Sequence, residues 1–490
     1  MAQSWETHFR LERSPGVPLY RQVASNVVKR VGSGLLVPGM ALPGTRSLAK
    51  SLGVHRNTVK AAYDELLADG WVSTAPSRGT FIAAELARQQ GGRDAASGAA
   101  NSTGQLAYRR TLVCNDGLHD PKLTPATELG RALRRAVRSP RVWTEADIRG
   151  HAGLRAAIAE MLRSNRAIAA TPEEILITGG RRISLCMVAR ALLTEGSTVA
   201  IEQPGNKAAW EIFPQCGLRV VGVPVDAEGL RVDCLEACGK VSAVYVTPSR
   251  QYPTAVSMPL QRRERLVSWC RKTGALIIED DSDCEFEFDG APMPALASMD
   301  TRVATIHIGT ISGMFAPAID SGYIRAPRSS TVRLARMGRL AGLCNDRIVE
   351  AALFDLAADG VLRRYLRRVR DVYRERRDQF ALALRKEFGC RLRFDLPGGG
   401  LAVWMTPCAE IDTRRWAACA HRLGVRFAPA TEYLLDRSPM GGIRIGFATF
   451  SNEELAAVAA TLRRSFPDGN AQTAAKSGQD DGSQLRRCTA

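Results

Sequence analysis

Apolar residues recur every four positions near the start of this chain. The spacing from Leu19 to Val31 predicts an amphipathic helix that ends at Gly32. A connection rich in glycine and proline follows, and a second, shorter helix is predicted over 46–52. Thr45 stands just before that helix, and threonine is a favoured N-cap residue, so we expect Thr45 to cap it.

A tight turn at Gly53 leads to a third helix, predicted from about Arg56 to Ala68 with its apolar residues on one face. Two short strand-like runs, 71–74 and 79–82, flank a turn and predict a hairpin. Helix, tight turn, helix and hairpin in this order form a winged helix-turn-helix, whose last helix enters the major groove of DNA. We therefore expect double-stranded operator DNA as a partner.

Residues that suit contacts with DNA stand at the positions that such a fold presents. Arginine and asparagine fit base edges, whereas threonine and lysine fit phosphates. The predicted DNA-contact residues are Thr45, Arg46, His55, Arg56, Asn57, Thr58, Lys60, Arg78 and Gly79. Residues 1–83 hold ten Lys and Arg against five Asp and Glu, a net charge of +5 that agrees with a polyanionic partner. A solvated surface helix is the alternative, and the register of helix, turn and hairpin argues against it.

The same stretch resembles the DNA-binding domain of the GntR family. The family signature runs Leu-Pro-Ser-x-Arg-x-Leu-Ala and then Val-x-Arg-x-Thr-Val. This chain has Leu-Pro-Gly-Thr-Arg-Ser-Leu-Ala at 42–49 and Val-His-Arg-Asn-Thr-Val at 54–59. Gly44 in place of serine is the notable departure. The resemblance implies a DNA-binding domain over residues 11–83.

The rest of the chain divides by composition. Residues 84–109 are rich in Gln, Gly, Ala, Ser and Arg and are interpreted as a flexible linker, and 467–490 as a disordered tail. Between them, 110–466 alternates strand-like runs, such as 174–178 and 275–279, with helix-like stretches. This order predicts a doubly wound α/β domain with a mostly parallel sheet, which binds ligands at the carboxyl ends of its strands.

A series of motifs follows these strands in the order typical of fold-type-I aminotransferases. The motifs are the stretches 246–254, 278–286, 308–323, 397–404 and 443–447. Together with the N-terminal segment they resemble the MocR subfamily of GntR regulators, in which a winged helix-turn-helix is joined to an aminotransferase-like domain. The resemblance implies a homodimer and names pyridoxal phosphate (PLP) as the family's cofactor.

Several residues of the family's cofactor site are changed. The lysine loop of the family reads Gly-Thr-Phe-Ser-Lys-x-x-x-Pro-x-x-Arg-x-Gly-Tyr, but here Gly313 stands at the lysine and Asp320 at the arginine. Ser282 replaces a tyrosine that contacts the cofactor, and Asn206 replaces a ring-stacking aromatic, whereas Asp280, the partner of the pyridine nitrogen, is kept. Glycine has no amine for a Schiff base, and aspartate repels phosphate. We expect no covalently bound PLP and no catalytic activity.

Polar residues of the same region define a candidate effector pocket. Its members are Gly180, Arg181, Arg182, Arg250, Asp280, Ser282, Gly313 and Arg444. In the family, the arginine matching Arg444 binds the substrate carboxylate, and several arginines together suit a small anionic effector. A structural ion pair is the alternative role for Arg444. Lys207 is the one cofactor-loop lysine left to replace the lost one, and we do not expect it to reach the aldehyde position.

Composition sets further limits. The net charge of +17 over 490 residues favours polyanionic partners. No apolar run approaches the ~20 residues of a membrane span, and the N-terminus does not resemble a signal peptide, so we expect a cytoplasmic protein with no membrane partner. Twelve cysteines are scattered without a C-x-x-C pair, which predicts no metal site.

These observations predict a homodimeric, DNA-binding transcription regulator. Its aminotransferase-like domain either senses an effector or only dimerises. Two rival interpretations stay open. One is a PLP-dependent aminotransferase, against which Gly313 argues, and the other is a DNA-binding dimer that needs no ligand.

Overall fold

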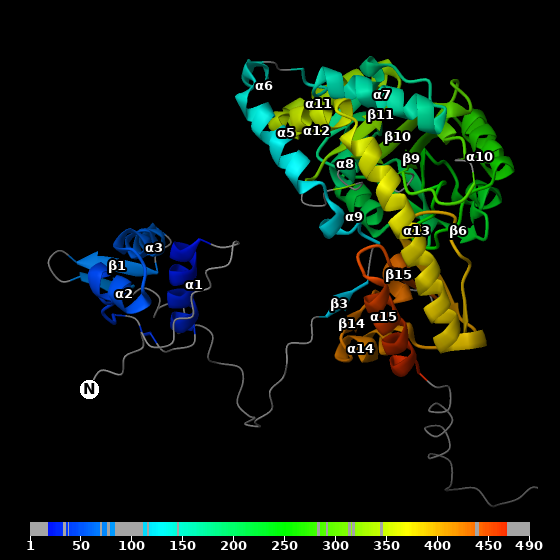
Figure 1. The fold of residues 1–490 in the computed structure, drawn as a ribbon. Coiled ribbons are helices and arrows are strands. Elements are labelled where there is room, and N and C mark those ends of the chain that lie inside the picture. Colours follow the sequence, from blue (N-terminus) through cyan, green and yellow to red (C-terminus); the bar gives the residue numbers. More distant parts are fainter. Residues whose placement is uncertain are drawn as a thin grey trace, which may run out of the picture. The chain divides into compact units, whose positions relative to one another are not determined.

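The computed structural model describes residues 18–32, 36–37, 39–68, 71–75, 79–83, 111–114, 117–144, 147–281, 285–290, 293–311, 315, 319–343, 346–436 and 441–467. These residues fall into two compact units, one within Met1–Ala107 and one within Tyr108–Ala490 (Figure 1). The predicted linker and tail, 84–109 and 467–490, lie almost wholly outside the described ranges.

The first unit has the elements that the hydrophobic pattern predicts. They are α1 (Leu19–Gly32), α2 (Thr45–Leu52), α3 (Arg56–Ala68), β1 (Val72–Ala75) and β2 (Gly79–Ile82). The four-residue spacing along α1 buries Val23, Val27 and Val31 against Leu48 of α2 and Val59 of α3. Each element is short, so packing of its apolar face, rather than helix propensity, is what stabilises it.

One detail of the first unit differs from the prediction. Gly44, not Thr45, is the N-cap residue of α2, with extended backbone angles and no side-chain cap. The Gly44 carbonyl oxygen accepts the first helical hydrogen bond, from the Leu48 N–H, so Thr45 is already inside the helix. Its hydroxyl accepts a hydrogen bond from Nε of Arg56 instead, at 3.4 Å.

The second unit is built on a large sheet. Its strands are β4 (Ile175–Thr178), β5 (Thr198–Gln203), β6 (Arg219–Asp226), β7 (Gly229–Leu230), β8 (Ala243–Val246), β9 (Leu276–Asp280), β10 (Thr305–Thr310) and β11 (Gly322–Arg325). They lie in the order β4-β11-β10-β9-β8-β5-β6-β7. The central neighbours, from β10 across to β6, pair in parallel, and β11 and β7 run antiparallel to their neighbours. The predicted α/β class with a mostly parallel sheet is confirmed.

Side chains that alternate along the central strands enter two different cores. Ile278 of β9 and Tyr245 of β8 belong to the core under α8 (Arg181–Leu192), α9 (Lys207–Gln215) and α11 (Arg328–Leu340). Ile277 and Val244, one position earlier, belong to the core under α10 (Leu260–Thr273). Helices therefore cover both faces, which explains why these strands carry apolar residues at consecutive positions instead of every second one.

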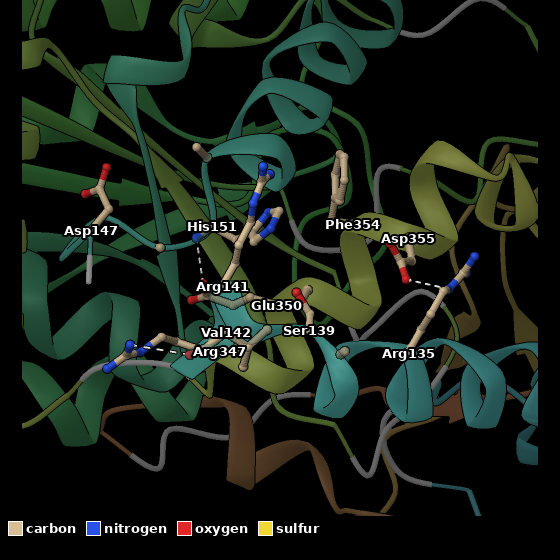
Figure 2. A pocket seen from close by; sticks show the side chains of 14 residues that line it. Arg135, Ser139, Arg141, Val142, Asp147, His151, Arg347, Glu350, Phe354 and Asp355 are labelled. Atoms are coloured by element: carbon tan, nitrogen blue, oxygen red, sulfur yellow. Dashed lines mark hydrogen bonds and ion pairs between the residues drawn. The ribbon is translucent and has the colours of Figure 1, made fainter. Parts of the chain in front are cut away.

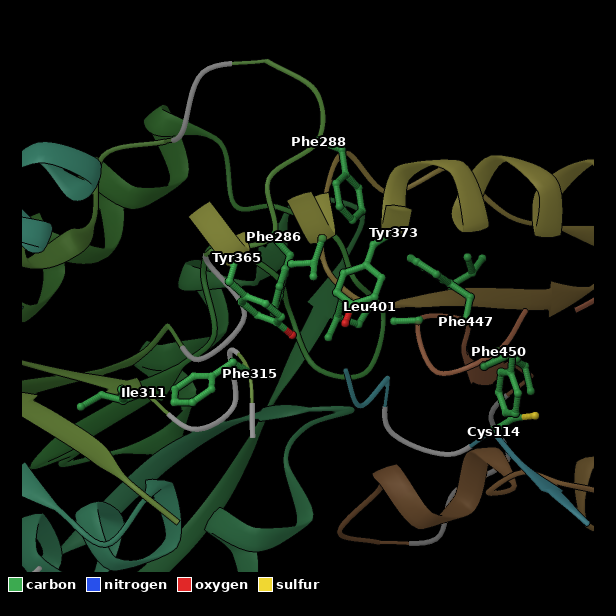
Figure 3. Packing of buried hydrophobic residues seen from close by; sticks show 14 of the residues in the cluster. Cys114, Phe286, Phe288, Ile311, Phe315, Tyr365, Tyr373, Leu401, Phe447 and Phe450 are labelled. Atoms are coloured by element: carbon green, nitrogen blue, oxygen red, sulfur yellow. The ribbon is translucent and has the colours of Figure 1, made fainter. Parts of the chain in front are cut away.

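A third core joins this sheet to the remaining elements. These are β3 (Leu112–Val113), α5 (Ala126–Arg138), α6 (Pro140–Thr144), α7 (Ala152–Arg166), α12 (Arg347–Ala358), α13 (Val361–Phe388), β12 (Leu392–Arg393), β13 (Ala402–Pro407), α14 (Thr413–Arg422), β14 (Val425–Arg426), β15 (Ile443–Gly446) and α15 (Asn452–Ser465). Tyr373 and Tyr365 of the long helix α13 meet Phe286 and Phe315 edge to face (Figure 3). Phe315 belongs to the predicted lysine loop, so its contact with Tyr365 joins this residue of the loop to α13.

Across the described ranges, no helix is long and apolar enough to cross a membrane. The same residues contain no group of three or more His, Cys, Asp or Glu side chains placed to hold a metal ion.

Candidate functional sites

Helix α3 presents a polar row to solvent. Arg56, Asn57 and Lys60 are exposed, whereas Val59 and Ala62 are buried. The row begins at a turn that glycine permits, because Gly53 has a φ of 63° and donates its N–H to the Ala49 carbonyl. The N-terminal end of α3 therefore points away from the core, as a helix that enters a DNA groove requires.

Neighbouring side chains hold this end of α3 in place. His55 Nδ1 accepts a hydrogen bond from the Asn57 N–H at 3.3 Å, so the imidazole caps the first turn. Tyr63 donates its hydroxyl to the Pro43 carbonyl at 2.8 Å and ties α3 to the loop before α2. Thr45 accepts a hydrogen bond from Arg56, and Arg46, the residue after Thr45, is exposed. The predicted contact residues of α2 and α3 thus lie next to each other.

The predicted wing is a two-stranded antiparallel ribbon with a third segment added. Val72 pairs with Ile82 and Ala75 with Gly79. The Leu42 N–H donates to the Thr80 carbonyl at 2.8 Å, which attaches the loop before α2 to β2. Gly79 has a φ of 108°, in a region that favours glycine. Arg78, predicted at the wing tip, lies outside the described residues.

The second unit gathers a different set of residues at the carboxyl ends of its strands. Asp280, at the end of β9, is almost fully buried and accepts a hydrogen bond from the Tyr245 hydroxyl at 2.6 Å. Asn206 Nδ2 donates to the Tyr245 oxygen at 3.1 Å, while Asn206 Oδ1 caps α9 by accepting from the Ala208 N–H. Burial, and then the negative charge of Asp280, raise the pKa of Tyr245 far above its usual range, so Tyr245 keeps its proton and donates it.

A carboxylate lies at the first turn of α8. Gly180 is the N-cap residue of α8, and a Cβ built on it would meet Asp320 Oδ1 at 2.5 Å. Arg181, the next residue, places its Nε 3.9 Å from Asp280 Oδ2. A helix N-terminus with free N–H groups attracts anions, and in the family it holds the cofactor phosphate. Here Asp320 brings a negative charge to the place where a phosphate would lie. The residues present therefore fit a phosphate poorly. We call Gly180, Arg181, Asn206, Tyr245, Asp280 and Asp320 the cofactor region.

The other predicted pocket arginines engage groups of their own. Arg182 is exposed and lies 3.5 Å from Glu211. Arg250 donates from Nη2 to both carboxylate oxygens of Glu287, at 2.7 and 2.6 Å. The exposed fraction of the Arg182 side chain is 64%, which marks a surface position.

Arg444 on β15 is buried. Its Nη1 donates to the Pro253 carbonyl at 2.9 Å, and its guanidinium lies 4.8 Å from the centre of the Tyr252 ring. The four predicted arginines therefore contact different partners: Asp280, Glu211, Glu287 and the Pro253 carbonyl. The prediction that they form one anion pocket gains no support from these contacts.

Three predicted residues of the cofactor site remain to be placed: Ser282, Gly313 and the alternative lysine, Lys207. Ser282 and Gly313 lie outside the described residues. Lys207, the alternative lysine, is exposed, and its Nζ lies 3.3 Å from Glu432 Oε2 in an ion pair.

Close to the cofactor region lies a group of buried polar side chains that the sequence did not reveal. Glu202 accepts hydrogen bonds from the Thr247 N–H and hydroxyl and from Gln251. Burial is the main cause that raises the pKa of Glu202 to about 7, and Asp280 adds to it. The sequence signal was a glutamate at the end of an apolar strand, in Ala200-Ile201-Glu202.

A second buried group surrounds Asp281. Arg166, the last residue of α7, forms an ion pair with the Asp281 carboxylate, and both side chains are buried. Burial acts to raise the pKa of Asp281, but the nearby positive charges, that of Arg166 first, outweigh it and lower the pKa. This ion pair holds Asp281, the residue that directly follows Asp280 at the end of β9.

A separate cavity of about 330 Å³ lies among α5, α6, α7 and α12 (Figure 2). His151 lines it: its backbone N–H donates to Glu350 Oε2 at 2.6 Å, and its ring lies 4.9 Å from that of Phe354. Arg135 at its edge pairs with Asp355 at 2.8 Å. None of these residues stood out in the sequence.

Comparison with known proteins covers both units. The family model for bacterial regulatory proteins of the gntR family matches residues 19–82, and that for aminotransferase class I and II matches 112–462. The probable rhizopine catabolism regulatory protein MocR of Rhizobium meliloti is 30% identical over 93% of this chain and 95% of its own length. The HTH-type pyridoxine biosynthesis transcriptional regulator PdxR of Corynebacterium glutamicum is 33% identical over 73% of this chain and 76% of its own.

Solved structures resemble the second unit. An archaeal alanine:glyoxylate aminotransferase superposes with a TM-score of 0.68 at 27% identity, over 72% of this chain and 90% of that one. The α-aminoadipate aminotransferase LysN of Thermus thermophilus gives 0.67 at 28% identity, over 72% and 92%.

Proposed function

This chain belongs to the MocR-type transcription regulators of the GntR family, and from that premise we propose how its parts divide the work. The N-terminal residues of α3 contact base edges of an operator, with Arg56 and Asn57 in the major groove and Lys60 on a phosphate. The observation that carries this assignment is the exposed row on α3, held by contacts from His55, Thr45 and Tyr63.

The further DNA contacts of the proposal come from the flanking elements. Arg46 at the start of α2, with Thr45 and Thr58, meets the backbone next to the groove, and Gly79 with Arg78 brings the wing to a phosphate or the minor groove. Two copies of the chain act as a homodimer through the aminotransferase-like domain, so two recognition helices contact two half-sites. An operator-binding protein acts where the chromosome lies, which implies a cytoplasmic location.

We propose further that the second unit has lost PLP chemistry. Gly313 offers no amine, and Asp320 places a carboxylate at the N-terminus of α8. Asp280 already has Tyr245 and Arg181 as neighbours. The domain is therefore not an enzyme. Any effector is a small anion held by the buried Arg444, or the domain only dimerises.

Footprinting of the DNA upstream of the protein's own gene tests this function. The full-length chain protects a discrete site, and the double variant Arg56→Ala with Asn57→Ala loses the protection. Arg21→Ala is the matched control, because Arg21 is an exposed arginine of the same unit on α1, paired with Glu65. Equal protection by wild type and double variant contradicts the assignment of α3. Amino-group transfer catalysed by the purified chain with added PLP contradicts the loss of enzyme chemistry.

A further inference from the structure

Two cysteines of the second unit lie side by side. Cys186 stands in the middle of α8, and Cys216 is the C-cap residue of α9. Their sulfur atoms are 4.0 Å apart, and both side chains are partly exposed. A disulfide bond needs the sulfurs at about 2.05 Å, so closing the gap takes about 2 Å.

The position of the pair matters because of the helices that it joins. Helix α8 begins at Gly180 and Arg181, and α9 is capped by Asn206. All three residues belong to the cofactor region, and α8 and α9 pack together under the same core. A covalent bond between Cys186 and Cys216 therefore fixes the two helices whose first turns border that region.

Arg190 provides charge at this pair. It lies on α8, one turn after Cys186, and its positive charge interacts with both thiols of the pair. The pKa of Cys216 is raised overall, by burial and then by the neighbouring Cys186, and Arg190 offsets part of this rise. A cation beside a thiol stabilises the thiolate, the form that attacks a peroxide or another sulfur.

From this geometry we infer that Cys186 and Cys216 are a reversible oxidation site, which a hydroperoxide converts into a disulfide between α8 and α9. One thiolate attacks the peroxide oxygen, breaks the O–O bond and becomes a sulfenic acid, and the peroxide leaves as an alcohol or as water. The second thiol then attacks that sulfur and releases water. Two thiols thus lose two electrons to one peroxide, and a small dithiol reverses the step by exchange.

Other cysteines provide the comparison. Cys234 and Cys238 are close in sequence, but the Cys238 thiol donates to the Cys234 carbonyl at 3.4 Å and the Cys234 thiol faces Asp233 at 3.9 Å. Cys419 is a half-buried thiol with an arginine, Arg422, at 3.1 Å, and so it matches Cys216 in exposure and charge.

The experiment treats the reduced full-length protein with hydrogen peroxide, then blocks free thiols and maps the peptides by mass spectrometry. The expected result is a cross-linked 186–216 peptide pair and the loss of two titratable thiols, both restored by dithiothreitol. Cys186→Ser and Cys216→Ser abolish the cross-link, whereas Cys419→Ser leaves it unchanged. Arg190→Gln slows its formation several-fold.

Three results overturn the inference. They are oxidation that stops at separate sulfinic acids on the two residues, a cross-link of either residue to a different cysteine, and a thiol count unchanged after treatment. The wild-type map needs no variant to fold, so it decides the matter alone if a serine variant is unstable. The outcome does not depend on DNA binding, so it fails or succeeds separately from the proposed function.

Discussion

The recognition helix α3 of the first unit keeps the sequence pattern of its family, whereas the cofactor region of the second unit departs from the aminotransferase pattern. Residues 54–59 keep the GntR signature, and the structure exposes His55, Arg56 and Asn57 among them with supporting contacts in place. The cofactor region departs from the aminotransferase pattern at Asn206 and Asp320, as the lysine loop does at Gly313. The fold of the second unit survives because buried residues such as Ile277 and Ile278, not site residues, hold its sheet. The fold can therefore be kept where residues of the site change.

The largest predicted effect concerns the buried support beneath the cofactor region. Arg166→Ala leaves the Asp281 carboxylate buried without this cation, which costs about 3–5 kcal/mol of unfolding free energy. Arg163→Ala, on the same helix, removes an exposed pair with Glu160 and costs at most about 1 kcal/mol. Urea unfolding at neutral pH measures both.

Asp281 also gives Arg166→Ala a pH signature. Its pKa is below the ordinary 3.8 in the folded state, so its contribution to stability is present above 3.8 and is lost as pH falls through the lower folded value. Arg166→Ala should flatten this acid limb. Equal unfolding free energies of the two arginine variants would contradict a stabilising role for the buried ion pair between Arg166 and Asp281.

A smaller effect is expected from Glu202. Its pKa is raised from 4.5 to about 7, so the stability that its proton brings is full below pH 4.5 and is lost as pH rises through about 7. The difference corresponds to on the order of 3 kcal/mol. Glu202→Gln keeps an acceptor for Thr247 and should remove this fall between pH 5 and 8. Unfolding curves across that range check it, and parallel curves for both proteins argue against a protonated Glu202.

In the first unit, Arg56→Ala and Lys60→Ala should separate two kinds of DNA contact. Loss of a base contact at Arg56 costs about 1–3 kcal/mol at the operator and reduces discrimination against other sequences. Loss of a phosphate contact at Lys60 weakens all sequences alike and lowers the salt slope of binding by about 1. Fluorescence anisotropy over a salt series measures both. Identical behaviour of the two variants contradicts these roles.

The smallest predicted effect concerns Gly44, the residue at which the first unit departs from the GntR signature. Gly44→Ser should stabilise α2 by a few tenths of a kcal/mol, because serine supplies the missing cap oxygen. A Cβ added at Gly44 meets no other atom within 4 Å. Gly44→Ala is the control that adds the same Cβ without the oxygen. Hydrogen exchange of the α2 amides reports the difference, and a gain for alanine equal to that for serine rules out capping as its cause.

The sequence predicted the elements of the first unit to within a residue or two, because their apolar spacing and glycine turns are local signals. It misplaced the N-cap by one residue, because Gly44 adopts the extended cap conformation and Thr45 already lies inside the helix. It also grouped Arg250 with Arg444, because carboxylate partners such as Glu287 come together only in the folded chain. Tyr245 and Glu202 went unnoticed since a buried strand hides polar residues among apolar ones.

The central claim is that this regulator keeps the aminotransferase scaffold without a covalently bound cofactor. Titration of the full-length chain with PLP, followed by absorbance and borohydride reduction, tests it most directly. Gly313→Lys combined with Asp320→Arg serves as the restored reference. The account predicts no visible band that borohydride removes in the wild type. Such a band in the wild type, with the label mapped by mass spectrometry to Lys207 or any other lysine of the second unit, would contradict it.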